Sequence, residues 1–153
     1  MGYKGWVLGF AMPSGLKRYF GKGHLHFITF SCYRRLPLLG SKRARDLFVT
    51  ELARVRQEMG FRLIGYVVML EHVHLLISEP KKGTPSKVLQ KLKQRVSRKM
   101  HRARGRCATA QLRMRFDDEA ESTMPFWQPR FYDFNVYSEG KKQEKLNYIH
   151  SIR

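Results

Sequence analysis

Cysteine is nearly absent from this chain of 153 residues, which contains only Cys32 and Cys107. So few cysteines exclude a disulfide framework and a cysteine-rich zinc cluster, and they fit a reducing cytoplasm. Long hydrophobic runs are absent too. No uninterrupted apolar stretch reaches about 18 residues, so we expect no transmembrane helix. Residues 1–13 include Lys4 and show no clear cleavage site, which argues against a signal peptide.

Acidic residues are also scarce. The chain has 12 Asp and Glu against 30 Lys and Arg, which gives a net charge of +18 and a pI near 10.4. Such an excess of positive charge indicates a polyanionic partner, most often nucleic acid. The length and the apolar fraction of 42% suit one domain with one core, and no internal repeat is present.

The most informative stretch is the apolar run at residues 67–77, which contains His72 and His74. Its branched residues predict a buried strand. Side chains alternate along a strand, so both histidines share one face, with Cα atoms roughly 6.5–7 Å apart, and Val73 faces the other way. Two neutral imidazoles can ligate one metal ion. Two core histidines satisfied by hydrogen bonds are the alternative.

A second His-x-His pair, His24 and His26, lies at the start of another predicted strand. Side chains at that end of a strand are more often solvated, so we expect no metal at this pair.

Periodicity and cap residues predict the other elements. The strands are 24–30, 61–68, 72–78 and the later half of 125–136. The middle two are either a hairpin, which is favoured, or one long strand bent around Leu70-Glu71. The helices run from the N-cap Ser41 to Gly60, from the N-cap Thr84 through Val96, and from Ser138 to Ile152. Residues 101–124 show no convincing period and are expected to form a long loop.

The order of these elements predicts an α+β fold. We expect a ferredoxin-like β-α-β-β-α-β core, a four-stranded antiparallel sheet with the helices gathered on one face, and a further C-terminal helix. Residues 23–153 form this single domain, and residues 1–22, which are Gly-rich and basic, form an N-terminal arm.

Positive charge is concentrated in residues 81–115, which contain thirteen Lys and Arg and no Asp or Glu. Like charges repel unless something neutralises them, so this segment is predicted to contact nucleic acid. Arg130 lies among five aromatic residues between 126 and 134, whose rings could stack on unpaired bases or fill the core; the core is favoured for Phe131 and Phe134. The residues predicted to bind DNA are Lys87, Lys91, Arg95, Arg98, Lys99 and Arg130.

Four segments together carry a resemblance to a known family. They are Gly65-Tyr66-Val67-Val68-Met69, Glu71-His72-Val73-His74-Leu75-Leu76, Phe126-Trp127-Gln128-Pro129-Arg130-Phe131-Tyr132-Asp133 and Lys145-Leu146-Asn147-Tyr148-Ile149-His150. In this order and spacing, the chain resembles the HUH-type single-tyrosine transposases of the IS200-like superfamily, and most of all their REP-associated relatives. The resemblance covers roughly residues 18–151.

This resemblance implies a mechanism. A divalent cation, Mg²⁺ or Mn²⁺, on His72 and His74 polarises the scissile phosphate of a single DNA strand. The Tyr148 hydroxyl attacks, forming a 5′-phosphotyrosine link and releasing a 3′-hydroxyl, and a second strand end can reverse the reaction. A free tyrosine, with a pKa near 10, needs the metal's help. Two imidazoles alone would suit zinc or a later transition metal better, so the metal stays open.

The resemblance also implies the setting of the site. His72 and His74 lie on a central strand and face the last helix, which carries Tyr148. The partner is single-stranded DNA containing hairpins of the REP type, and the protein is a monomer or homodimer in the cytoplasm, associated with the nucleoid. We expect no membrane partner, because the basic helix shows no exposed aromatic face.

One position departs from the family pattern. The family has an Asn or Gln one helical turn after the tyrosine, where this chain has Ile152, which cannot ligate a metal. The family pattern also continues beyond the last residue here, so the C-terminus is predicted to be short. Glu144 and Glu71 are the alternatives for a third ligand.

Two functions therefore stay open: an enzyme that nicks and rejoins single-stranded DNA, and a hairpin-binding protein derived from one that no longer cuts. An RNA-binding module is a weaker alternative, because the chain lacks the aromatic pair on adjacent central strands that such modules use.

Overall fold

The computed structural model describes residue 17, residues 19–111 and residues 124–152, with the backbone alone at 105–111. The strands are β1 (Leu25–Cys32), β2 (Leu63–Val68), β3 (His72–Ser78) and β4 (Trp127–Val136). The helices are α1 (Lys42–Met59), α2 (Pro85–Gln111) and α3 (Glu139–Ser151), with a short 3-10 turn, η1 (Tyr33–Arg35), after β1. None of the helices in these described parts of the chain is long and apolar enough to cross a membrane.

The sheet has the order β2-β3-β1-β4, and every neighbouring pair is antiparallel. The ferredoxin-like core is therefore confirmed, with β1 and β3 at its centre and β2 and β3 forming the expected hairpin. Cap residues set the helix ends as the sequence predicts. The Ser41 hydroxyl accepts a hydrogen bond from the Ala44 amide at 3.1 Å, and Gly60 ends α1 in the left-handed conformation.

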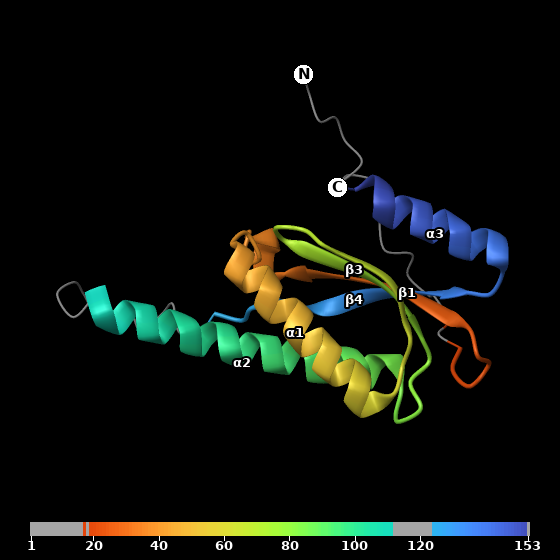
Figure 1. Cartoon of the computed structure of the whole chain (residues 1–153), viewed down its shortest axis with the longest axis horizontal. Helices are drawn as coiled ribbons and strands as arrows, with labels where there is room; N and C mark the ends of the chain where they lie inside the picture. The colour runs from red at the N-terminus through yellow and green to blue at the C-terminus, as the bar shows by residue number, and fades with distance from the viewer. Residues whose placement is uncertain (1–16, 18, 112–123, 153) are drawn as a thin grey trace, which may run out of the picture.

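The expectation that all helices gather on one face is wrong for α3. Figure 1 shows α1 and α2 on one side of the sheet and α3 on the other. The reason is that both faces of the central strands are apolar. Ile28, Val73 and Leu75 pack in the larger core under α1 and α2, whereas Leu76 packs in a smaller core with Ile149 of α3. An apolar sheet face must be covered, and α3 covers the second one.

The expected loop at 101–124 is also partly wrong, because α2 continues to Gln111. Residues 101–111 contain several good helix formers and no proline, so they can stay helical. The end of α2 extends beyond the sheet (Figure 1), so an apolar stripe directed at the sheet is not required there. The rest of the predicted loop, at 112–123, lies outside the described residues, as do residues 1–16 and 18 of the predicted arm.

Candidate active site

His72 and His74 lie side by side on the central strand β3, on the face that α3 covers. Their ring centroids are 4.8 Å apart, and Val73 between them is fully buried in the opposite core. This is the alternation that the sequence predicts.

Tyr148 reaches the same place from α3. Its ring lies edge-on to His74 with centroids 5.3 Å apart, and edge-on to Phe27 at 6.1 Å. α3 docks through its one buried residue, Ile149. The strand beneath has a glycine at the contact: a Cβ on Gly65 would lie 3.1 Å from Leu146 Cδ2 and 3.4 Å from Ile149 Cδ1. The missing side chain therefore allows the close approach of helix and sheet.

Each imidazole has one nitrogen engaged and one directed elsewhere. His74 Nδ1 shares a 2.7 Å hydrogen bond with Thr29 Oγ1, and His72 Nδ1 shares one of 3.3 Å with Glu71 Oε1. His74 Nε2 is buried without a hydrogen-bond partner in the described residues. Metal-ligating histidines have this arrangement, with the second nitrogen held by a neighbour. The pair therefore fits a bound cation.

Burial sets the protonation of these groups. It lowers the pKa of His74 to about 3, and the nearby His72 and Lys145 act in the same direction. Burial also lowers the pKa of His72, against the opposing effect of Glu71. Both imidazoles are thus neutral at pH 7, as a metal ligand requires. Burial raises the pKa of Tyr148, so its hydroxyl keeps its proton at neutral pH.

The three side chains line a cleft of about 550 Å³ between the sheet and α3. Arg35, Arg130 and Lys145 supply positive charge to the same cleft. Such a lining suits a phosphodiester backbone next to the histidines and the tyrosine. Of these cations, only Arg130 is among the residues that the sequence predicts to bind DNA.

The sequence predicts the positions of the other two cations, Lys145 and Arg35, to different degrees. Lys145 lies one turn before Tyr148 on α3, with its Nζ 5.0 Å from the Phe27 ring centroid, and helical spacing alone could have found it. Arg34 and Arg35 have φ of 50° and 54°. Non-glycine residues rarely adopt this left-handed conformation, so no sequence pattern predicts the turn that brings Arg35 to the cleft.

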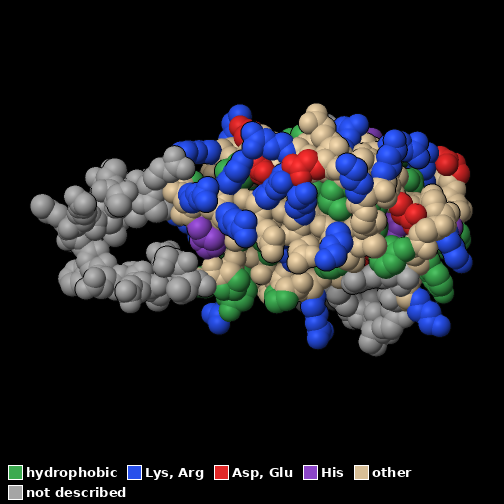
Figure 2. Space-filling view, turned by 90° about the horizontal axis from the view of Figure 1, so that it is seen from below, with side chains coloured by type: hydrophobic (Ala, Val, Ile, Leu, Met, Phe, Trp, Pro, Cys, Tyr) green, Lys and Arg blue, Asp and Glu red, His purple; other side chains and the backbone are tan. Residues whose placement is uncertain are grey.

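The other residues predicted to bind DNA lie on α2, across the sheet from the cleft. Lys91 Nζ and Arg95 Nη1 lie 2.7 and 2.6 Å from the Glu58 carboxylate of α1, and these hydrogen bonds lower the Glu58 pKa to about 2. Lys99 pairs in the same way with the buried Glu51. Seen from below Figure 1, Lys and Arg cover much of this side, with a few acidic groups among them (Figure 2).

Lys87 and Arg98 are exposed on the same helix. The sequence segment 81–115 contains no acid, so its counter-charges come from a different helix. DNA contact by all of these α2 residues remains a prediction.

In the part of the chain that the structure describes, no further His, Cys, Asp or Glu joins the histidine pair as a third ligand. Among the described residues, no cluster of three or more His, Cys, Asp or Glu could hold a metal. Ile152 is half-buried at the end of α3. Glu144 pairs with Lys141 at 2.8 Å, and Glu71 contacts Nδ1 of His72. Since Nδ1 and Nε2 lie on different edges of the ring, Glu71 is placed to orient His72.

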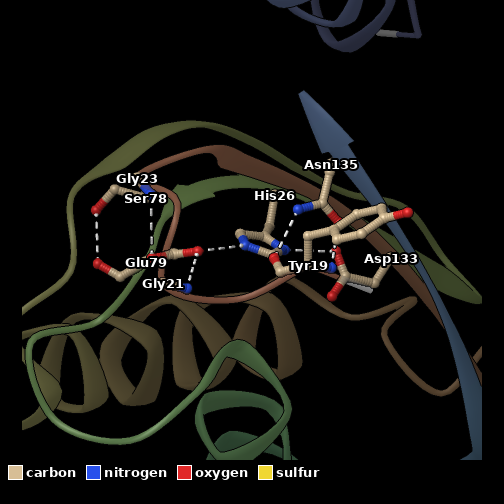
Figure 3. A network of polar contacts seen from close by, with 8 residues as sticks. All are labelled: Tyr19, Gly21, Gly23, His26, Ser78, Glu79, Asp133 and Asn135. Atoms are coloured by element: carbon tan, nitrogen blue, oxygen red, sulfur yellow. Dashed lines mark hydrogen bonds and ion pairs between the residues drawn. The ribbon is translucent and has the colours of Figure 1, made fainter. Parts of the chain in front are cut away.

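The second His-x-His pair differs from the expectation, because His26 is fully buried. Its Nδ1 shares a 2.9 Å hydrogen bond with Asp133 Oδ1, and Glu79 Oε1 lies 3.6 Å from its Nε2 (Figure 3). Residues 19–23 cover this end of the sheet: Asn135 Nδ2 donates to the Tyr19 carbonyl at 2.7 Å, and the Gly21 amide donates to Glu79 at 3.0 Å. Burial under this segment is why His26 is not solvated.

Asp133→Ala should destabilise the fold. It removes the partner of a fully buried imidazole nitrogen, so we expect the free energy of unfolding to fall by about 1–3 kcal/mol. Asp46→Ala is the control, since the Asp46 carboxylate forms an exposed pair with Lys42 and its loss should change stability by less than about 0.5 kcal/mol. Urea denaturation followed by circular dichroism measures both. Equal stability of the two variants would contradict a structural role for the Asp133–His26 pair.

The family to which the chain belongs agrees with this geometry. The sheet, the two histidines and the tyrosine-bearing helix are the parts on which the resemblance of the sequence rests. The family described as "Transposase IS200 like" matches residues 20–151, and the chain belongs to this family. The assignment made from the four sequence segments is thereby confirmed. No curated protein matches the chain.

Two solved structures share the fold. One is a REP-associated tyrosine transposase bound to a REP hairpin; its TM-score is 0.64 at 20% identity, over 89% of this chain and 70% of the other. The second is a crystal structure of a candidate transposase from Deinococcus radiodurans R1; its TM-score is 0.58 at 18% identity, over 88% of this chain and 95% of the other. At these identities the likeness concerns the fold.

Proposed function

We propose that the protein nicks and rejoins single-stranded DNA at hairpin sequences, with Tyr148 as the nucleophile and a divalent metal on His72 and His74. The observation that carries the proposal is the convergence of the tyrosine and the two histidines in one basic cleft. The hairpin substrate is supported by the REP hairpin in the similar transposase structure. A bound cation would supply Lewis-acid polarisation of the phosphate, and Mg²⁺ or Mn²⁺ is the proposed ion.

In this proposal, different residues bind the phosphodiester and attack it. Arg35, Arg130 and Lys145 hold the phosphodiester against the sheet through charge-assisted hydrogen bonds. The Tyr148 oxygen attacks phosphorus while the bond from phosphorus to the 3′ oxygen breaks. The tyrosine proton passes to solvent, and the leaving 3′ oxygen takes up a proton.

In this step a phosphotyrosine ester replaces a phosphodiester of the DNA, so the energy of the broken bond is conserved in the new one. The 3′-hydroxyl of another strand end can attack the phosphotyrosine, which frees Tyr148 and joins the strands without ATP. Neutral histidines suit this cycle because they keep lone pairs for the cation.

A denaturing gel tests the proposal. The purified protein is incubated with a hairpin-containing single strand and Mn²⁺, with parallel reactions in Mg²⁺, Zn²⁺ and EDTA. A 5′-phosphotyrosine link joins the protein to the downstream fragment, so a 3′-end label should move with the protein and a 5′-end label should mark a free fragment. A metal-dependent adduct with the 3′ label supports the proposal. An adduct that carries the 5′ label would overturn this polarity of attack.

A DNA-binding protein that no longer cuts is the second candidate, and Ile152 favours it. This half-buried aliphatic residue stands where the family pattern has an amide ligand. In that case the parent protein binds the hairpin but forms no adduct, and Ile152→Asn, which restores an amide oxygen one turn after Tyr148, should raise the adduct yield. If the parent neither binds nor cuts, both candidates are wrong.

Salt dependence should separate the cleft from the α2 surface. Each phosphate contact on a single strand contributes about 0.7 to the slope of log affinity against log salt. We expect Arg130→Ala to lower the slope by about that amount. The double change Lys91→Ala and Arg95→Ala should lower the slope by less than the amount expected for two contacts, because the single Glu58 carboxylate already offsets part of the charge of these two side chains. Fluorescence anisotropy titrations at several NaCl concentrations measure the slopes. An unchanged slope for Arg130→Ala would contradict the proposal that DNA binds in the cleft.

A further inference from the structure

Thr29 lies directly across from His74 in the sheet. The two residues are Cα partners in the pairing of β1 with β3, and their side chains meet on the face that α3 covers. The distance from Thr29 Oγ1 to His74 Nδ1 is 2.7 Å, whereas His74 Nε2 has no hydrogen-bond partner among the described residues. The His74 side chain has therefore one fixed nitrogen and one that is left for a ligand.

A neutral imidazole carries a single proton, on Nδ1 or on Nε2. If Nδ1 carries it, the N–H donates to the Thr29 hydroxyl, and Nε2 keeps the lone pair that a cation needs. If Nε2 carries it, a buried N–H has no acceptor, which folded proteins rarely tolerate. The environment of His74 therefore favours the proton on Nδ1.

The neighbouring histidine follows the same scheme with a different partner. His72 Nδ1 lies 3.3 Å from a carboxylate oxygen of Glu71, and an ionised carboxylate only accepts hydrogen bonds. The proton of His72 is thus drawn to Nδ1 as well. Both Nε2 atoms therefore keep their lone pairs: that of His72 through Glu71, the residue before β3, and that of His74 through the Thr29 hydroxyl on β1.

We propose that Thr29 is the positioning residue of His74: its hydroxyl holds the ring in the Nδ1–H tautomer, with Nε2 available to a divalent cation in the cleft. The inference rests on the proposed metal role of His74. It adds a residue outside the four segments that carry the family resemblance. A β-branched residue suits the task, because its side chain has few rotamers on a strand.

Nuclear magnetic resonance of the metal-free protein tests the tautomer directly. Long-range ¹H–¹⁵N spectra distinguish a protonated from an unprotonated ring nitrogen. We expect His74 of the parent protein to carry its proton on Nδ1. Thr29→Val keeps the shape and removes the hydroxyl, so the proton should move to Nε2 or divide between the two nitrogens. Thr29→Ser restores the hydroxyl and should return the spectrum of the parent.

Mn²⁺ affinity, measured by calorimetry, provides the second readout. Loss of a partner of this kind typically weakens metal binding by about 10–100-fold, and we expect this loss for Thr29→Val and near-parent affinity for Thr29→Ser. Thr50→Val is the matched control, since the Thr50 hydroxyl donates to the backbone carbonyl of Asp46 on the exposed face of α1. It should change neither the spectrum nor the affinity.

The outcomes separate the two proposals. An Nε2–H tautomer in the parent protein would overturn the role of Thr29, and this measurement needs no variant to fold. An unchanged tautomer and unchanged Mn²⁺ affinity in Thr29→Val would overturn it too. If the parent holds the Nδ1–H tautomer but binds no Mn²⁺, the metal function fails, and the tautomers of the two Thr29 variants still decide what the hydroxyl does to the ring.

Discussion

Tyr148→Phe is expected to abolish the covalent adduct between protein and DNA while leaving the fold and the hairpin affinity close to those of the parent. The change removes only the hydroxyl oxygen. The contacts of the ring with His74 and Phe27 do not depend on that oxygen, so a phenylalanine can keep them. Without the hydroxyl no phosphotyrosine can form, and the labelled adduct on a denaturing gel should fall below detection.

Tyr132→Phe is the matched control for this loss, because Tyr132 lines the same cleft. It should keep the adduct. Cleavage by the Tyr148→Phe protein at the rate of the parent would mean that the nucleophile is another residue. Tyr132 would then be tested first, since Tyr137 is 68% exposed and does not line the cleft.

His72→Ala should have the second large effect. It removes one of the two imidazoles proposed to hold the cation, so we expect the adduct yield with Mn²⁺ to fall by at least about 100-fold. The His72 side chain is partly exposed at the start of β3, so the fold should survive. Hairpin binding in EDTA should stay near the parent value, since the cations of the cleft are intact.

His150→Ala is the control for His72→Ala. His150 is exposed on α3 and does not line the cleft of the two strand histidines. Its replacement should leave the adduct yield unchanged. Parent-level adduct in the His72→Ala protein, with the same Mn²⁺ dependence, would show that the metal is held elsewhere.

The parts of the structure that follow from local rules could be predicted from the sequence. Strand alternation put His72 and His74 on one face, and the cap residues Ser41 and Gly60 set the ends of α1. The hairpin of β2 and β3 follows from two apolar runs with a bend around Leu70-Glu71 between them. Each of these features depends on residues close together in the chain, which is why a sequence pattern predicts them.

Features that depend on distant residues were not predicted. His26 is buried because Asp133 and residues 19–23 meet it across the sheet. The charge of α2 is partly neutralised by Glu58, which lies on another helix. The family resemblance placed the last helix over the two histidines, but the apolar character of both sheet faces, which puts α3 opposite α1 and α2, became visible only once the partners of each strand were known.

The glycine at position 65 gives the site a mechanical property. Leu146 and Ile149 of α3 pack against Gly65, a strand position without a side chain. This packing sets the distance of α3, and so of Tyr148, from the sheet that carries the histidines. A methyl group added there would lie 3.1 Å from Leu146 Cδ2 and 3.4 Å from Ile149 Cδ1, so the side chains that dock α3 on the sheet would have to shift. In-line attack on phosphorus tolerates little such displacement. Gly65, on the edge strand β2, thus sets how closely α3, the helix that carries the proposed nucleophile, approaches the sheet.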